Sequence, residues 1–148
     1  MITVTDVAAI TRQVKQMLET APALDGVRIE RGADPDTMGD YLGWVSIYRS
    51  SVNYPPRSLG AGAGSRRQLI RLVLLVSMSH PMSGEDCEDD LEALIKKVMD
   101  VILSDTSLGG LVDTLDDDIS VQYDSYDKVD NVYKQRALVF FTGVLQVY

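Results

Sequence analysis

The sequence predicts an α+β domain in which a mainly antiparallel sheet of four to five strands has two helices packed on one face. Two segments have apolar residues at helical spacing, whereas the other apolar segments are rich in β-branched residues and are separated by turn residues. The expected order is α-β-β-β-α-β-β. The 148 residues show no internal repeat and no break in composition, so we expect a single domain spanning residues 1–148.

The first helix is predicted to begin after Thr5 or Asp6, because either side chain can cap a helix N-terminus. Ala21-Pro22 ends it, since the residue before a proline is pushed out of the helical region. The apolar residues that recur on one face of this helix are Val7, Ile10, Val14, Met17 and Leu18.

Two strands are expected next. Residues 27–31 (VRIER) alternate apolar and polar side chains, as a short half-buried strand does. Residues 32–40 (GADPDTMGD) are typical of a turn. Residues 42–49 (LGWVSIYR) then predict the second strand.

A long hairpin loop, at about residues 49–67, is predicted to join the second strand to the third. It contains most of the run NYPPRSLGAGAGSRRQ, residues 53–68. This run does not match a Walker loop, because Ser65 stands where the second glycine belongs and Arg66 stands where lysine belongs. The dinucleotide pattern G-x-G-x-x-G also fails at Ser65, and a strand rather than a helix follows it. We therefore interpret the run as a hairpin extension rather than a phosphate-binding loop.

The third strand and the second helix follow this loop. Residues 68–78 (QLIRLVLLVSM) form an apolar, β-branched run that ends at the turn 80–81. Ser83 is the predicted N-cap of the second helix, and Glu85 and Asp86 lie in its first turn, where the helix dipole favours anions. The stripe expected to be buried comprises Cys87, Leu91, Leu94, Ile95, Val98, Ile102 and Leu103.

Two more strands are predicted, 118–123 (DISVQY) and 135–148 (QRALVFFTGVLQVY), with a polar loop at 124–134 between them. The last strand is apolar on both faces, with Ala137, Val139, Phe141, Leu145 and Val147 on one side and Leu138, Phe140, Val144 and Tyr148 on the other. Two helices can cover only one face of a sheet. The second face is therefore expected to meet a partner or to lie beneath loops of the same chain.

The composition, 45% hydrophobic and 24% charged, is typical of a soluble globular protein. The net charge of -8 argues against tight binding of nucleic acid, which depends on neutralising phosphates. No apolar run is long enough to cross a bilayer and no signal-peptide pattern is present, so we expect no membrane association. A chain with one cysteine is expected in a reducing, cytoplasmic environment. The single cysteine, Cys87, excludes an intramolecular disulfide and a multi-cysteine zinc site.

No group of residues predicts catalysis or metal binding. The only histidine, His80, precedes a proline at a turn, and no third group is expected to orient it as a base. The consecutive acids at 116–118 alternate faces in a strand, and Asp124, Asp127 and Asp130 step by three, unlike the D-x-D-x-D-G of a calcium loop. We expect a non-enzymatic protein without cofactor, catalytic residues or metal.

The chain resembles the tail terminator proteins of long-tailed bacteriophages, of the minor tail protein U type. The resemblance rests on the element order and on a helix ending in APALDGVRIERG, a strand pair with a long loop, and a helix DDLEALIKKVMDVILSDTSLGGLV. It continues through DDDISVQYDSYD to a terminal strand ALVFFTGVLQVY. These signatures span nearly the whole chain, and none of them is a catalytic fingerprint.

The resemblance implies a structural virion protein located at the head-proximal end of the tail and assembled in the host cytoplasm. Such proteins form hexameric rings that end polymerisation of the tail tube and provide the surface for head-tail joining. The implied partners are other copies of the chain, the tail tube protein and a head-completion or neck protein. DNA is expected to pass through the lumen without specific binding, which suits an acidic chain.

The residues that we expect at these interfaces are Tyr54, Arg57, Arg66, Arg67, Arg71, Phe140, Val144 and Tyr148. Two other functions remain open from the sequence: a head-closure or neck connector protein, and an oligomeric binding module unrelated to a virion. An enzyme is the third and weakest interpretation.

Overall fold

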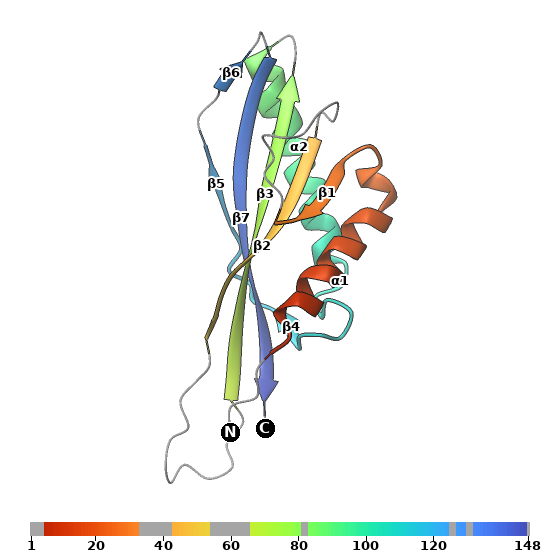
Figure 1. The fold of residues 1–148 in the computed structure, drawn as a ribbon, viewed down its shortest axis with the longest axis vertical. Helices are drawn as coiled ribbons and strands as arrows, with labels where there is room; N and C mark the ends of the chain where they lie inside the picture. The colour runs from red at the N-terminus through yellow and green to blue at the C-terminus, as the bar shows by residue number, and fades with distance from the viewer. Residues whose placement is uncertain are drawn as a thin grey trace.

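The computed structural model describes residues 5–32, 43–53, 66–80, 83–124, 127–129 and 132–147. Within these residues the predicted α+β class is confirmed, with two α-helices on one side of an open, mixed sheet (Figure 1). The strand order is β1-β2-β3-β7-β4, and β5 and β6 also pair with β7.

Both helices begin at a predicted capping residue. Helix α1 spans Val7–Thr20, and the Asp6 carboxylate accepts a hydrogen bond from the Ala9 amide at 3.0 Å. Helix α2 spans Gly84–Leu103, and the Ser83 hydroxyl oxygen accepts from the Asp86 amide at 3.2 Å. A short 3₁₀ helix, η1 (Pro22–Leu24), follows α1. The buried residues of the helices are Ile10, Thr11, Val14 and Leu18 in α1 and Cys87, Leu91, Leu94, Ile95, Val98 and Ile102 in α2.

The first two strands are parallel, which makes the sheet mixed. Strand β1 (Arg28–Arg31) pairs in parallel with the first residues of β2 (Gly43–Asn53), Ile29 lying opposite Val45. The turn-rich segment 32–40 favours a chain reversal, but turn composition alone does not distinguish a tight hairpin from a longer return to the same end of the sheet. The direction of β1 relative to β2 is therefore a tertiary outcome.

Strands β2 and β3 (Arg66–His80) are antiparallel and longer than predicted. Their pairing extends to Asn53 opposite Leu69, with a bulge between Arg49 and Ser51. Polar residues beyond Arg49 obscure the strand pattern, yet a ladder of backbone hydrogen bonds does not require apolar side chains. The expected loop at 49–67 is thus too long at its N-terminal end, because the described strands include residues 49–53 and begin again at Arg66.

The C-terminal strand β7 (Val132–Val147) pairs with β3 along its whole length. Its other edge is paired in turn with β4 (Thr114–Leu115), β5 (Ser120–Tyr123) and β6 (Asp127–Val129). The predicted four to five strands and their order are therefore wrong, and part of the polar segment 124–134 is strand. Strands of two or three residues are too short to produce a periodic pattern.

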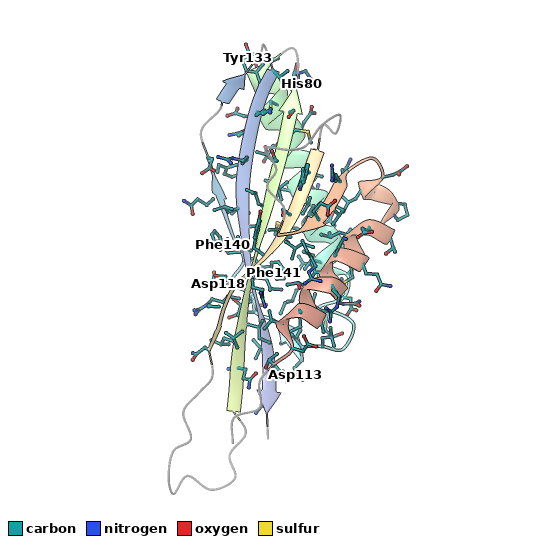
Figure 2. All side chains as sticks on the ribbon, in the orientation of Figure 1. His80, Asp113, Asp118, Tyr133, Phe140 and Phe141 are labelled. Atoms are coloured by element: carbon teal, nitrogen blue, oxygen red, sulfur yellow. The ribbon has the colours of Figure 1, made fainter. Side chains whose placement is uncertain are left out.

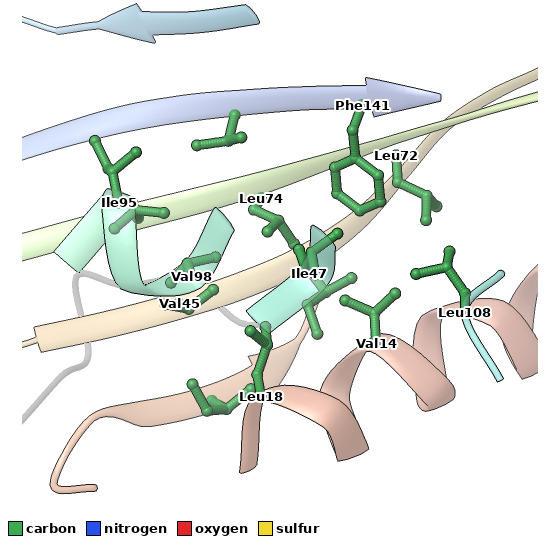
Figure 3. Close-up of a cluster of buried hydrophobic side chains, with 14 of the residues drawn as sticks. Val14, Leu18, Val45, Ile47, Leu72, Leu74, Ile95, Val98, Leu108 and Phe141 are labelled. Atoms are coloured by element: carbon green, nitrogen blue, oxygen red, sulfur yellow. The ribbon is translucent and has the colours of Figure 1, made fainter. Parts of the chain in front are cut away.

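The core lies between the sheet and the two helices (Figure 3). Alternate residues of β3 and β7, among them Leu72, Leu74 and Phe141, point toward the helices and meet Val14 and Val98 in one buried cluster. Phe141 is 2% exposed. The helix face of β3 and β7 therefore supplies most of the sheet's contribution to the core of the single chain.

The segment that follows α2 is organised by Asp105. Its carboxylate accepts hydrogen bonds from the Ser107 hydroxyl at 2.6 Å, the Ser107 amide at 3.1 Å and the Gly109 amide at 2.9 Å. The hydrogen bond from the Ser107 hydroxyl and that from the Gly109 amide lower the pKa of Asp105 below its usual value. Gly109 has a φ of +70°, which favours glycine.

The hydrogen bonds to Asp105 are expected to make a contribution to the free energy of unfolding that depends on pH. Because the folded state lowers the pKa of Asp105, the stabilisation is fully present above the usual aspartate pKa and is lost as the pH falls through the lowered value. We expect Asp105→Asn to be less stable than the unmodified protein at pH 7, with the difference shrinking below about pH 4. Urea denaturation at several pH values measures this, and a difference that stays constant down to pH 2 would contradict it.

Candidate interaction surfaces

One face of the sheet carries no helix in the described structure. On this open face the side chains of Val73 and Phe140 are cross-strand neighbours, as are those of Leu75 and Leu138. Tyr48 of β2 lies on the other side of Val73. All five are only partly buried. Figure 2 shows Phe140 on the side of β7 away from the helices and Phe141 on the helix side, as their alternation predicts.

The open face is basic at both ends. Arg67 and Arg71 are exposed and share this face with Val73, since they are separated from it by even numbers of residues in β3. Lys134 and Arg136 occupy the same face of β7 at the other end, where Arg136 lies 3.9 Å from the Asp124 carboxylate. Strands β2, β3 and β7 contain no Asp or Glu at all.

The structure brings together three of the eight predicted interface residues. Arg67, Arg71 and Phe140 all lie on the open face. Val144 is only 5% exposed in the single chain, so it is not accessible on this face as the three others are. It lies where β4 pairs with β7, and its carbonyl accepts a hydrogen bond from the Asp113 amide at 2.9 Å. Tyr54, Arg57, Tyr148 and the side chain of Arg66 lie outside the described residues.

Strand β1 is the edge strand beside β2, on the other side of the sheet from β4, β5 and β6. The guanidinium of Arg28 lies 4.5 Å from the centre of the Trp44 ring, a cation–π contact, and donates to Glu30 at 3.0 Å. Trp44 is 1% exposed, and its indole N–H has no hydrogen-bond partner among the described residues. The accessible apolar part of the open face is therefore formed by β3, β7 and the middle of β2.

A second apolar surface is a groove between α2 and β5, with a volume of about 550 Å³. We call it the α2–β5 groove, and its apolar lining is formed by Ala93, Ile95, Met99, Leu103, Val121 and Tyr123. Two of these side chains are unusually accessible for their size, Tyr123 at 53% and Leu103 at 44%.

The sequence did not reveal this groove. Leu103 is predicted to be buried with the α2 stripe, and this prediction is wrong: the residue is the last of the helix, lines the groove and is 44% exposed. Tyr123 shares a face with Val121 through strand alternation. That alternation was the one available signal, but the position of β5 relative to α2 depends on the whole fold.

The rim of the groove is acidic. Asp89, Glu92 and Asp100 line it together with one cation, Lys96. The exposed surface of α2 continues this charge toward its N-terminus, where Glu85, Asp86, Glu88 and Asp90 are also exposed and no basic residue occurs. Carboxylates thus predominate on the exposed surface of α2, whereas cations lie on the open face of the sheet.

His80 and Cys87, the two residues that the sequence analysis considered for chemical roles, make contacts within the fold. His80 Nδ1 accepts a hydrogen bond from the Ser83 amide at 3.2 Å, and its Nε2 lies 3.9 Å from the Asp90 carboxylate, so it anchors the turn before α2. Cys87 is fully buried, with its thiol directed at the carbonyl oxygens of Met78 (3.4 Å) and Tyr133 (3.6 Å). Burial raises the pKa of this thiol.

Among the described residues, no cluster of three or more His, Cys, Asp or Glu side chains is placed to hold a metal ion. In the same part of the chain, neither helix is long and apolar enough to cross a membrane. Comparison of the sequence with models of known protein families and with curated proteins finds no match.

Proposed function

We propose that this protein is a structural subunit of a bacteriophage tail, a terminator that forms a hexameric ring on the end of the tail tube and stops its polymerisation. The ring would also provide the surface to which the head docks. The observation that supports this proposal best is the open face of the sheet: β7 supplies Phe141 to the core and Phe140 to a surface that neither described helix covers.

A closed ring requires heterologous contacts, in which one patch of a subunit meets a different patch of the next. Partly buried apolar side chains gathered on one sheet face are suited to such a contact, because large apolar patches on soluble proteins mark interaction sites. The acidic chain suits a lumen through which DNA passes without being held, since binding of DNA depends on cations at its phosphates. The other proposed partners are the tail tube protein and a head-completion protein.

The net charge of -8 also predicts how the isolated protein behaves. Bringing several copies together raises like-charge repulsion, so we expect weak self-association at low salt and stronger association as salt screens it or as the tube end offers complementary contacts. Light scattering over a series of salt and protein concentrations measures this.

The test of the proposed function uses the protein with a tail tube protein encoded by a neighbouring gene. We expect negative-stain micrographs of the mixture to show rings with a central hole and tubes that end in one, whereas tube protein alone should form tubes of irregular length. A compact dimer as the only species at every concentration, with no effect on tube length, would refute the terminator. A ring that binds head-completion protein but leaves tubes unaffected would instead indicate a neck connector.

A further inference from the structure

We infer that the open face of one copy packs against the α2–β5 groove of the next copy. The inference rests on the proposed ring and goes further, because it names the two surfaces that meet at each contact. Both surfaces have an apolar centre: Val73, Leu75 and Phe140 on the face, and Met99 and Tyr123 in the groove.

The charges around these centres are complementary. Arg67 and Arg71 lie at one end of the apolar part of the open face and Lys134 and Arg136 lie at the other. Asp89, Glu92 and Asp100 line the groove and outnumber Lys96. Opposite potentials on two surfaces steer them together and specify their pairing. Strands β2, β3 and β7 bear no carboxylate that would oppose the acidic rim. The acids on adjoining segments include Glu30 of β1, which pairs with Arg28, Asp124, which lies beside Arg136, and the exposed run 116–118 between β4 and β5.

The same charges disfavour a symmetric contact. Two open faces packed against each other would bring the arginines of both copies to one interface, and two grooves would bring carboxylates together. Like charges that face each other across an interface weaken the binding of that partner. The open face is therefore a better match for the groove of another copy than for another open face, and the same holds for the groove. Because each contact uses the open face of one copy and the groove of the next, every pair of subunits keeps one open face and one groove free for further subunits.

Cross-linking with single cysteines tests the pairing directly. Thr142, opposite Arg71 on the open face, and Ala93, an exposed residue of the groove lining, are each changed to cysteine. We expect a short bismaleimide to cross-link a mixture of Thr142→Cys and Ala93→Cys into dimers, and to cross-link neither variant alone. The double variant should give a ladder of higher species. The unmodified protein is the control, because Cys87 is fully buried.

Three outcomes would overturn the inference. Self-cross-linking of Thr142→Cys would show that two open faces meet, and self-cross-linking of Ala93→Cys would show that two grooves meet. Absence of cross-links in the mixture at every protein concentration would show that these surfaces do not touch. If a mixture without cross-links still formed rings at tube ends, the proposed function would be supported, but the subunits would meet through other surfaces. If cross-links formed but the protein had no effect on the tubes, the contact would be supported and the terminator function refuted.

Charge reversal provides an independent measurement. Arg71→Glu and Glu92→Lys are each expected to weaken self-association about tenfold, by placing like charges at the contact. Mixing the two variants should restore association, because every contact between the two different variants pairs opposite charges, so that alternating copies can assemble. Arg12→Glu, an exposed change of the same size on α1, is the matched control and should have little effect. A general charge effect would instead weaken self-association of Arg71→Glu and Arg12→Glu equally, since each makes the net charge of -8 more negative by two, and would strengthen association of Glu92→Lys. That pattern, with no specific recovery on mixing, would contradict the specific contact.

Discussion

Phe141→Ala should lower the free energy of unfolding by about 3–5 kcal/mol, the usual cost of removing a buried phenylalanine ring. Phe141 is 2% exposed and points from β7 into the cluster that contains Leu72 (Figure 3). The helices and the sheet can close over the vacated space only in part, so the cost includes a cavity. Urea denaturation measures the loss, and the dependence of the unfolding free energy on urea should stay nearly unchanged.

Phe140→Ala is the matched control in the same strand. The ring is only partly buried and faces away from the helices, so we expect a clearly smaller loss of stability and a folded monomer. The same variant should weaken self-association, because the ring belongs to the open face. Equal destabilisation of the monomer by both substitutions would contradict the assignment of two functions to the two faces of β7.

Gly143→Ala is expected to destabilise the protein by about 1–3 kcal/mol, as overpacking of a core does. A Cβ atom at Gly143 would lie 2.9 Å from Cγ1 of Val112, a buried side chain that is stiff at χ1. The backbone of Gly143 has no positive φ, so the cost comes from crowding rather than from a conformation that only glycine adopts.

A double-mutant cycle separates this crowding from other effects. Val112→Ala removes both Cγ atoms near the new methyl group, and it should itself be destabilising because Val112 is buried. In the Val112→Ala background, Gly143→Ala should cost much less or become stabilising, with a coupling of about 0.5–3 kcal/mol. Additive effects of the two substitutions would show that the close approach of β7 to this segment is not the cause.

Several features followed from local sequence alone. Asp6 and Ser83 cap the helices because a short polar side chain satisfies amide groups only a few residues away. The buried stripes of α1 and α2 follow from helical spacing, with Leu103 as the exception at the last residue. The opposite directions of Phe140 and Phe141 follow from strand alternation, which needs no knowledge of neighbouring strands. The common face of Arg67 and Arg71 follows from the same alternation within β3.

The tertiary structure alone decided how distant segments pair. The parallel direction of β1 against β2, the division of one edge of β7 among β4, β5 and β6, and the burial of Val144 all depend on contacts between residues far apart in the sequence. The α2–β5 groove exists because Leu103 and Tyr123, twenty positions apart, are brought to one surface by the pairing of β5 with β7. Periodicity determines which face of an element is apolar, but only the packing of the elements determines which apolar faces stay uncovered.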